Sequence, residues 1–147
     1  MEDELSGALT LAFDLLEVSD DSLDATFDSR CPICANEENV LEPARTRLAE
    51  HGFTLTNETM TPPHYVGGNS DFVKTLLKAY ERYTGRKGTC ESMGGGTYVH
   101  SLKNGVAFGA AMPETDNRMH GADEFAVIDE LLVSAKIFAQ VITDLCR

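Results

Sequence analysis

The sequence predicts a mixed fold, α+β in its first part and closer to α/β in its second. Apolar and polar residues alternate over residues 9–27, which is the period of a β-strand. Apolar residues recur every three or four positions over residues 70–85 and 124–146, as on one face of a helix. The expected element order is β-β-α-β followed by α-β-(α)-β-α. The first part then corresponds to half of a split β-α-β sheet.

A β-hairpin is predicted near the start of the chain. The polar turn at residues 19–22 separates two alternating runs, and their apolar positions are Leu9, Leu11, Phe13 and Leu15, then Leu23, Ala25 and Phe27. The opposite face of the second strand is polar and carries Asp24, Thr26, Asp28 and Arg30. We expect that face to be solvated or turned toward a polar site.

A helix and a third strand are expected after the hairpin. The helix ends at Gly52, with Asn36 or Asn39 as its N-cap, and Pro43 is tolerated only in its first turn. Residues 53–60 read as a strand with apolar side chains on one face. This strand would complete the β-β-α-β order.

A hinge is predicted where the composition changes. The stretch TPPHYVGGNS holds two prolines and two glycines in ten residues, which favours a linker over a regular element. We therefore expect a first domain over residues 1–61, a hinge over 62–69 and a second domain over 70–147.

Two helical patterns are expected, one at each end of the second domain. The first has Ser70 as N-cap, Gly85 just beyond its end, and the apolar stripe Phe72, Leu76, Leu77, Tyr80 and Tyr83. The short apolar runs at residues 88–93 and 105–112 read as buried strands. In the terminal helix, the residues expected to face inward are Ile128, Leu131, Leu132, Ala135, Phe138, Ala139 and Ile142.

Charge and composition argue against several classes of function. The 147 residues carry a formal net charge of −12, so binding to nucleic acid or to anionic membranes is disfavoured. No apolar run is long enough to span a bilayer, and the N-terminal residues lack the basic and apolar regions of a secretory signal. These features predict a cytoplasmic protein, in which the four cysteines are expected to be thiols.

Three short motifs offer chemistry, and each has a structural alternative. Gly94, Gly95, Gly96 and Thr97 lie between a predicted strand and a short helix, where they could cradle an anion or simply form a tight turn. His120 lies in a polar loop, where it could ligate a metal ion or be an exposed side chain.

The third motif is the pair Cys31 and Cys34, separated by two residues. This spacing suits half of a zinc knuckle, a dithiol redox pair, or cysteines with no chemical role. No second Cys-x-x-Cys completes a four-ligand zinc site, so we favour structural or incidental cysteines.

The order of several motifs resembles one enzyme family along nearly the whole chain. The matching pieces are Asp-Ser-Arg-Cys-Pro at residues 28–32, Gly-Gly-Gly-Thr-Tyr at 94–98, Lys-Asn-Gly-Val-Ala-Phe-Gly at 103–109, and Met-His before the acidic residues and the terminal helix. They are similar to the C-terminal part of the di-zinc peptidase superfamily of aminoacylases, acetylornithine deacetylases, succinyl-diaminopimelate desuccinylases and carnosinases. The resemblance is closest to the bacterial dipeptidases of the PepV type.

This resemblance implies a fold and a set of roles. Residues 1–61 would be half of a ferredoxin-like lid domain of the dimerisation type, and residues 70–147 the C-terminal part of the catalytic domain. His120 would ligate one of two zinc ions. Arg30 would reach from the lid to the substrate carboxylate, and Gly94, Gly95, Gly96 and Thr97 would lie against a bound dipeptide or N-acyl amino acid.

The departures from the family limit what this chain is expected to do alone. No His-x-Asp motif is present, and Glu37-Glu38 is better interpreted as a solvated pair at a helix start than as the family's catalytic glutamates. The general base and the remaining zinc ligands would lie in a missing N-terminal half. We expect the isolated chain to be inactive, to bind no zinc stably, and to form a homo-oligomer through unpaired strand edges. The alternative is a non-catalytic module for self-association or regulation.

Overall fold

The computed structural model describes residues 1–109 and 112–146. The chain divides into two compact units, of which the first comprises Met1–Tyr65 together with Ser92–Gly96. The second unit comprises Val66–Glu91 and Thr97–Arg147. The boundary after Tyr65 lies inside the predicted hinge, whereas the glycine segment 92–96 lies in the first unit and not in the second, where we had expected it.

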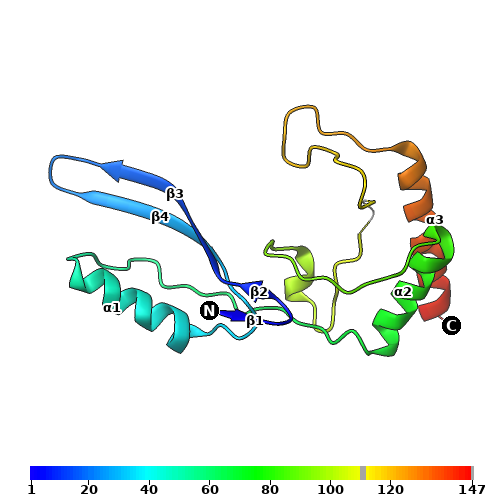
Figure 1. Cartoon of the computed structure of the whole chain (residues 1–147), viewed down its shortest axis with the longest axis horizontal. Helices are drawn as coiled ribbons and strands as arrows, with labels where there is room; N and C mark the ends of the chain where they lie inside the picture. Colours follow the sequence, from blue (N-terminus) through cyan, green and yellow to red (C-terminus); the bar gives the residue numbers. More distant parts are fainter. Residues whose placement is uncertain (110–111, 147) are drawn as a thin grey trace. The chain divides into compact units, whose positions relative to one another are not determined.

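The first unit contains two hairpins (Figure 1). The short one pairs β1 (Glu2–Asp3) with β2 (Gly7–Ala8), and the long one pairs β3 (Thr10–Val18) with β4 (Leu23–Arg30). The long hairpin is antiparallel, with Thr10 opposite Arg30 and Val18 opposite Leu23, and it confirms the predicted hairpin and its turn. The register shifts between Phe13 and Leu15, which is the pattern of a β-bulge.

The long hairpin leaves most of its apolar side chains exposed. Phe13 is 76% exposed and Val18 is 69% exposed, although Phe13 makes an edge-to-face contact with Phe27 at 6.3 Å. Two strands alone cannot bury an apolar face, so this sheet depends on its backbone ladder and on contacts at its ends.

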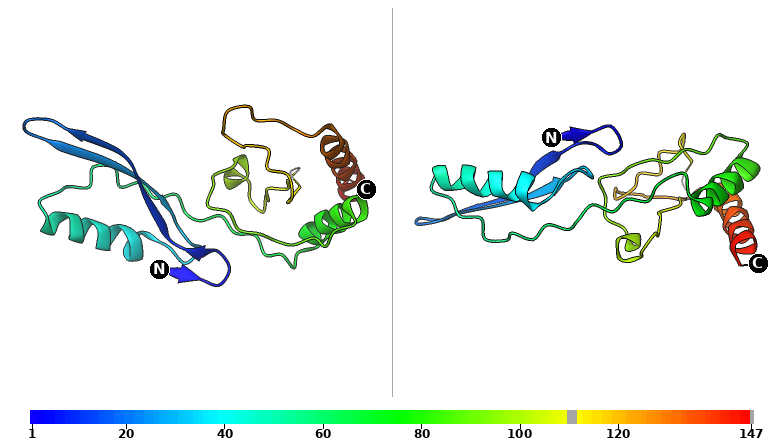
Figure 2. Two further views of the ribbon diagram at one scale, coloured as in Figure 1. Left: turned by 45° about the horizontal axis from the view of Figure 1, so that its top comes forward. Right: turned by 90° about the horizontal axis from the view of Figure 1, so that it is seen from below.

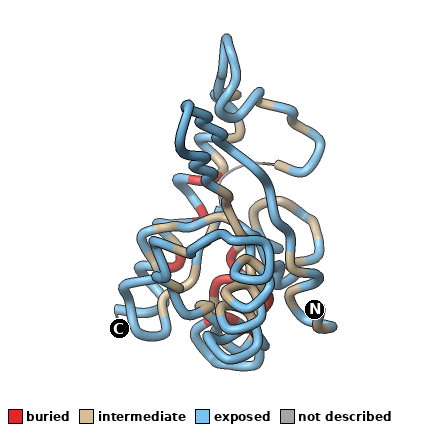
Figure 3. Tube along the Cα trace, turned by 90° about the vertical axis from the view of Figure 1, so that its left-hand side faces the viewer, coloured by how far each residue is buried: buried red, intermediate tan, exposed pale blue. Residues whose placement is uncertain are grey.

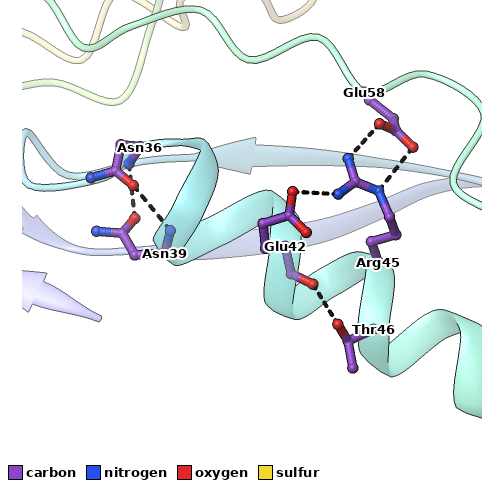
Figure 4. A network of polar contacts seen from close by, with 6 residues as sticks. All are labelled: Asn36, Asn39, Glu42, Arg45, Thr46 and Glu58. Atoms are coloured by element: carbon purple, nitrogen blue, oxygen red, sulfur yellow. Dashed lines mark hydrogen bonds and ion pairs between the residues drawn. The ribbon is translucent and has the colours of Figure 1, made fainter.

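The predicted helix is present and begins with a reciprocal cap. Asn36 accepts a hydrogen bond from the Asn39 amide, and the Asn39 side chain accepts one from the Asn36 amide (Figure 4). One π-helical turn, Glu37–Leu41, leads into α1 (Glu42–Glu50), with Pro43 in the first turn as the sequence required. Gly52 follows the helix with φ of +78°, a conformation that favours glycine.

The third strand predicted over residues 53–60 is wrong, because these residues form no ladder with β3 or β4. The segment is tied to α1 by side chains instead. Arg45 forms a bidentate pair with Glu58, with Nε to Oε1 at 3.2 Å and Nη2 to Oε2 at 2.5 Å (Figure 4). Hydrogen bonds from Arg45 hold the pKa of Glu58 below its usual value. The sheet of the first unit therefore has fewer strands than the expected β-β-α-β order requires.

In the second unit, the helix predicted from residue 70 is confirmed with both of its caps. It is α2 (Asp71–Thr84), and Ser70 accepts a hydrogen bond from the Val73 amide at 3.2 Å. Gly85 ends it in the left-handed conformation. A short 3₁₀ helix, Tyr98–Ser101, follows the glycine run, and the terminal helix is α3 (Ile128–Leu145).

The core of the second unit lies between α2 and α3, which pack against each other in both views of Figure 2. Its buried members are Leu76, Ala79, Ile137 and Val141. Few other segments are buried, as the small amount of red in Figure 3 shows. Of the stripe predicted on α2, Leu76 is buried and Leu77, Tyr80 and Tyr83 are half-buried, but Phe72 is exposed.

The inward face predicted for α3 is wrong. The buried residues are Ser134, Ile137 and Val141, and all seven residues that we expected to face inward are exposed. The physical reason is that α3 is apolar on nearly every side, so a 3.6-residue period fits more than one face. The neighbour, α2, decides which one is buried.

The strands predicted at residues 88–93 and 105–112 are also wrong where the structure describes them. Residues 88–93, 105–109 and 112 are not in strands, and residues 110–111 lie outside the described residues. Val106 and Phe108 pack their side chains against the helical core, and Phe108 makes an edge-to-face contact with Phe138 at 5.5 Å. The run at 105–109 therefore contributes side chains to the core without forming a strand. Among the described residues, no helix has the length and apolar character needed to cross a membrane.

Candidate functional site

Arg30 is the last residue of β4, and its guanidinium has a partner on two sides. Nη1 donates a hydrogen bond to the carbonyl oxygen of Gly94 at 2.7 Å. Nη2 lies 2.5 Å from Oδ2 of Asp28, two positions earlier on the same strand. The Arg30 side chain is 50% exposed and that of Asp28 is 43% exposed. The first unit therefore presents a half-exposed guanidinium that is held between a carboxylate and a glycine carbonyl.

Gly94 leaves little room for a side chain. A Cβ atom at this position would lie 3.2 Å from both Cβ and Cγ of Arg30, which is tighter than ordinary van der Waals contact. At Gly95, a Cβ would meet only the terminal Cε of Met93 at 3.5 Å. The glycine run thus includes one position where the backbone must approach the Arg30 stem closely.

Thr97 belongs to the second unit and caps the 3₁₀ helix. Its hydroxyl accepts a hydrogen bond from the Val99 amide, and its own amide donates to Nδ1 of His100, both at 3.4 Å. The three glycines lie in the first unit and Thr97 in the second. The polar atoms of Thr97 are therefore engaged in capping its own turn.

His120 is exposed and lies in the loop that leads into α3. Three residues of this loop, Arg118, His120 and Asp123, have φ between 56° and 62°, which is uncommon for residues other than glycine. The Phe125 amide donates to the carbonyl of Asn117 at 3.2 Å and so closes the loop around His120.

Two polar contacts anchor this loop to the helices of the second unit. Arg86, just beyond α2, pairs with Glu114, and the hydrogen bond from Arg86 lowers the pKa of that carboxyl. Thr115 donates to Glu130 in the first turn of α3. The loop that carries His120 is thus tied to both helices before it turns.

The structure does not bring a metal site together from the described residues. No three His, Cys, Asp or Glu side chains within residues 1–109 and 112–146 form a group that could hold a metal ion. The exposed imidazole of His120 is chemically suited to donate one nitrogen to a zinc ion whose other ligands come from elsewhere.

The Cys31–Cys34 turn follows Arg30 directly, and all four cysteines of the chain are free thiols. The Ser6 hydroxyl accepts a hydrogen bond from the Ile33 amide at 2.8 Å and so holds the turn against the short hairpin. Ser6 in turn donates to Asp3 through its hydroxyl and its amide, and these hydrogen bonds lower the pKa of Asp3 from 3.8 to about 2. The short hairpin therefore supports the chain immediately after Arg30.

Sequence reasoning identified Arg30 and the glycine run but missed Asp28 as a partner of the guanidinium. A signal was available, because Asp28 and Arg30 are two positions apart and share one face of the predicted strand. The hydrogen bond from Arg30 to Gly94 joins residues 64 positions apart, and no local pattern could predict it.

Comparison with known proteins finds relatives that all carry dipeptidase names. No family model matches the chain. The chain is 38% identical over 147 residues to "Putative dipeptidase YtjP" of Bacillus subtilis, which covers 99% of this chain and 31% of that protein. It is 45% identical over 93 residues to the Beta-Ala-Xaa dipeptidase of Lactobacillus delbrueckii subsp. lactis, covering 63% of this chain and 20% of that protein. A "Putative dipeptidase" of Staphylococcus epidermidis is 37% identical over 109 residues, covering 74% of this chain and 23% of that protein.

These relatives share the dipeptidase name and differ from this chain in length. The chain spans less than a third of the length of the curated relatives that it matches. The match to the Bacillus protein nevertheless extends over nearly all of this chain, across both structural units. The chain is therefore homologous to a part of proteins that carry dipeptidase names.

Proposed function

We propose that this chain is the C-terminal part of a zinc-dependent dipeptidase or related amidohydrolase, of the PepV-type group within the di-zinc peptidase superfamily. The substrate would be a dipeptide or an N-acyl amino acid. The observation that carries the proposal is the 38% identity to YtjP along 99% of the chain. The exposed guanidinium of Arg30 and the exposed imidazole of His120 support it with suitable chemistry.

Arg30 is proposed to bind the carboxylate of the substrate. A guanidinium is planar and presents paired N–H donors that match the two oxygens of a carboxylate. The Arg30 side chain is half-exposed, so a ligand can reach it within the first unit. Gly94, Gly95, Gly96 and Thr97 are proposed to lie beside the bound peptide.

His120 is proposed to supply one zinc ligand. Zinc, when bound, would polarise the scissile carbonyl and favour hydroxide at neutral pH. The two anchors of the His120 loop, Arg86 with Glu114 and Thr115 with Glu130, would hold the imidazole where it can reach the ion. The other ligands and the general base are proposed to lie in the part of the longer protein that this chain does not contain.

The division of labour between the two parts of the chain is also a proposal. Residues 1–61 would belong to the lid and residues 70–147 to the catalytic domain, joined through the hinge at 62–69. The cytoplasmic location stays a prediction from the sequence.

A chimera provides the test. The segment of YtjP that aligns with this chain is replaced by the chain itself, and hydrolysis of dipeptides and zinc content are measured. We expect zinc-dependent hydrolysis by the chimera and none by the isolated 147 residues. His120→Ala should lower both activity and zinc content, whereas His51→Ala, which changes an exposed histidine of the first unit, should change neither.

Two outcomes would contradict the proposal. Zinc-dependent hydrolysis by the isolated chain, abolished by His120→Ala, would show that the chain needs no missing half. A folded, zinc-loaded chimera without hydrolytic activity would favour the alternative of a non-catalytic module.

A further inference from the structure

We propose that Asp28 and Gly94 are positioning residues that hold the guanidinium of Arg30 in place for a substrate carboxylate. This inference rests on the proposed function for its catalytic meaning, but its structural content concerns the first unit alone. Neither residue is proposed to touch the reacting bond. Both act through Arg30.

The guanidinium of Arg30 is fixed by contacts at both of its terminal nitrogens. Nη1 donates to the Gly94 carbonyl at 2.7 Å, and Nη2 lies 2.5 Å from the Asp28 carboxylate. An exposed arginine at the end of a strand would otherwise sample many rotamers, and binding a ligand would then cost the entropy of ordering it. Contacts at two nitrogens restrict both the position and the plane of the guanidinium, because one contact alone would let it swing.

Gly94 contributes a second restriction through its missing side chain. The stem of Arg30 passes so close that a Cβ at Gly94 would lie 3.2 Å from both Cβ and Cγ of the arginine. The glycine therefore lets its own carbonyl reach Nη1 while its α-carbon supports the stem. An alanine here would push the stem away, and the hydrogen bond to the carbonyl would lengthen.

The contact with Asp28 does not occupy all the hydrogen-bond donors of Arg30. A guanidinium has five N–H donors, and the two contacts to Asp28 and Gly94 leave others to bind a carboxylate. The Asp28–Arg30 pair is about half-exposed, and exposed pairs of this kind add little to stability. Its main effect would therefore be on the orientation of Arg30.

The negative charge of Asp28 also opposes a second carboxylate nearby, so two opposite effects on substrate binding can be distinguished by experiment. If Asp28 mainly orients Arg30, its removal weakens binding of the substrate carboxylate. If Asp28 mainly occupies Arg30 as a substitute for substrate, its removal strengthens binding. The structure favours orientation, because Asp28 meets one nitrogen of the guanidinium while Gly94 holds the other.

The first experiment uses the 147-residue chain and needs no activity. The mobility of the Arg30 Nε–H group is measured by ¹⁵N relaxation in the wild type, in Asp28→Asn and in Gly94→Ala. We expect Arg30 to become more mobile in both variants. The matched controls are Asp24→Asn, on the same face of β4, and Gly95→Ala, where an added Cβ meets only the end of Met93. Both controls should leave Arg30 as ordered as in the wild type.

The second experiment measures kinetics in the YtjP chimera with a dipeptide and with the same dipeptide amidated at its carboxyl end. Asp28→Asn should raise KM for the dipeptide about fivefold, as expected for an exposed pair of about 1 kcal/mol. KM for the amide and kcat for the dipeptide should not change, and Asp24→Asn should match the wild type.

The two experiments separate failure of this inference from failure of the proposed function. An inactive wild-type chimera contradicts the proposed function, while the Arg30 relaxation data still decide whether Asp28 and Gly94 order the guanidinium. An Arg30 that is equally mobile in the wild type and in Asp28→Asn overturns the inference, and so does a lower KM in Asp28→Asn. If Gly94→Ala fails to fold, as judged from its amide spectrum, Asp28→Asn alone decides.

Discussion

Replacing Ile137 by alanine tests which face of α3 packs against α2. Ile137 is 2% exposed and lies in the core with Leu76, Ala79 and Val141. The change removes three carbon atoms, each worth about 0.8 kcal/mol of transfer free energy, so about 2.4 kcal/mol is lost before any cavity forms. A cavity adds to this cost, and we expect the free energy of unfolding to fall by about 3–4 kcal/mol.

Ile142→Ala is the matched control, because it makes the same chemical change on the same helix. The sequence pattern placed Ile142 in the core, whereas the structure leaves it 61% exposed. A change at an exposed position should alter the free energy of unfolding by less than about 0.5 kcal/mol. The contrast between the two isoleucines therefore tests the structure against the sequence pattern.

The assay is urea unfolding of the dilute chain, followed by far-ultraviolet circular dichroism. The core of the second unit is small, so Ile137→Ala could leave α2 and α3 unfolded in water. Ile137→Val, with an expected loss of about 1 kcal/mol, then supplies a measurable transition. Equal losses for Ile137→Ala and Ile142→Ala, or a larger loss for Ile142→Ala, would refute the assignment of the buried face.

Four further predictions concern other parts of the chain. Asp3 accepts its hydrogen bonds as a carboxylate, and they lower its pKa from 3.8 to about 2. The stabilising effect of Asp3 should therefore be complete above pH 3.8 and be lost as the pH falls through 2. An NMR titration of Asp3 and of the Ser6 amide measures the midpoint, and an Asp3 midpoint near 3.8 would contradict the prediction. Ser70→Ala should cost about 1 kcal/mol, because it removes the N-cap of α2, and urea unfolding measures the loss; no change would show that the cap adds nothing. Arg30→Lys in the chimera should weaken binding of the substrate carboxylate by about 1.5–3 kcal/mol, read from kcat/KM, since lysine keeps the charge but loses the planar fork; wild-type kinetics would remove Arg30 from the site. Sedimentation equilibrium at micromolar concentration should show a mass above 16.0 kDa that depends on concentration, because β3 and β4 expose apolar side chains; a single species at 16.0 kDa would contradict self-association.

Local signals in the sequence predicted the elements that are stabilised locally. The hairpin of β3 and β4 followed from its alternation and polar turn, and α2 followed from Ser70 and Gly85 at its ends. These features depend on hydrogen bonds between residues close in sequence. They can therefore be predicted without knowing the partners of each element.

The errors lie where a distant partner decides the outcome. Residues 53–60 have the composition of a strand, but a strand needs a neighbouring ladder, and the segment is tied to α1 through Arg45 and Glu58 instead. The buried face of α3 depends on α2, because apolar residues occur on several sides of the helix.

The same distinction between local signals and distant partners applies to the candidate site. Arg30, His120 and the glycine run could be singled out from the sequence, because their chemistry follows from the residue type alone. Asp28 could have been paired with Arg30 from their shared face of the predicted strand, whereas the Gly94 carbonyl became visible as a partner only through geometry. A backbone carbonyl carries no signal in the sequence, so the second of these contacts could not have been predicted.

The passage of residues 92–96 through the first unit has a consequence for cutting the chain. The backbone changes units three times, after Tyr65, after Glu91 and after Gly96. A protease that cuts once after Tyr65 would leave Gly94 on the C-terminal fragment, while its partner Arg30 stays on the N-terminal fragment. The hydrogen bond from Arg30 to Gly94 would then connect two separate fragments. Expression of residues 1–65 alone would yield a first unit that lacks residues 92–96. Complementation between two fragments, rather than separation into two independent domains, is the behaviour that this connectivity favours.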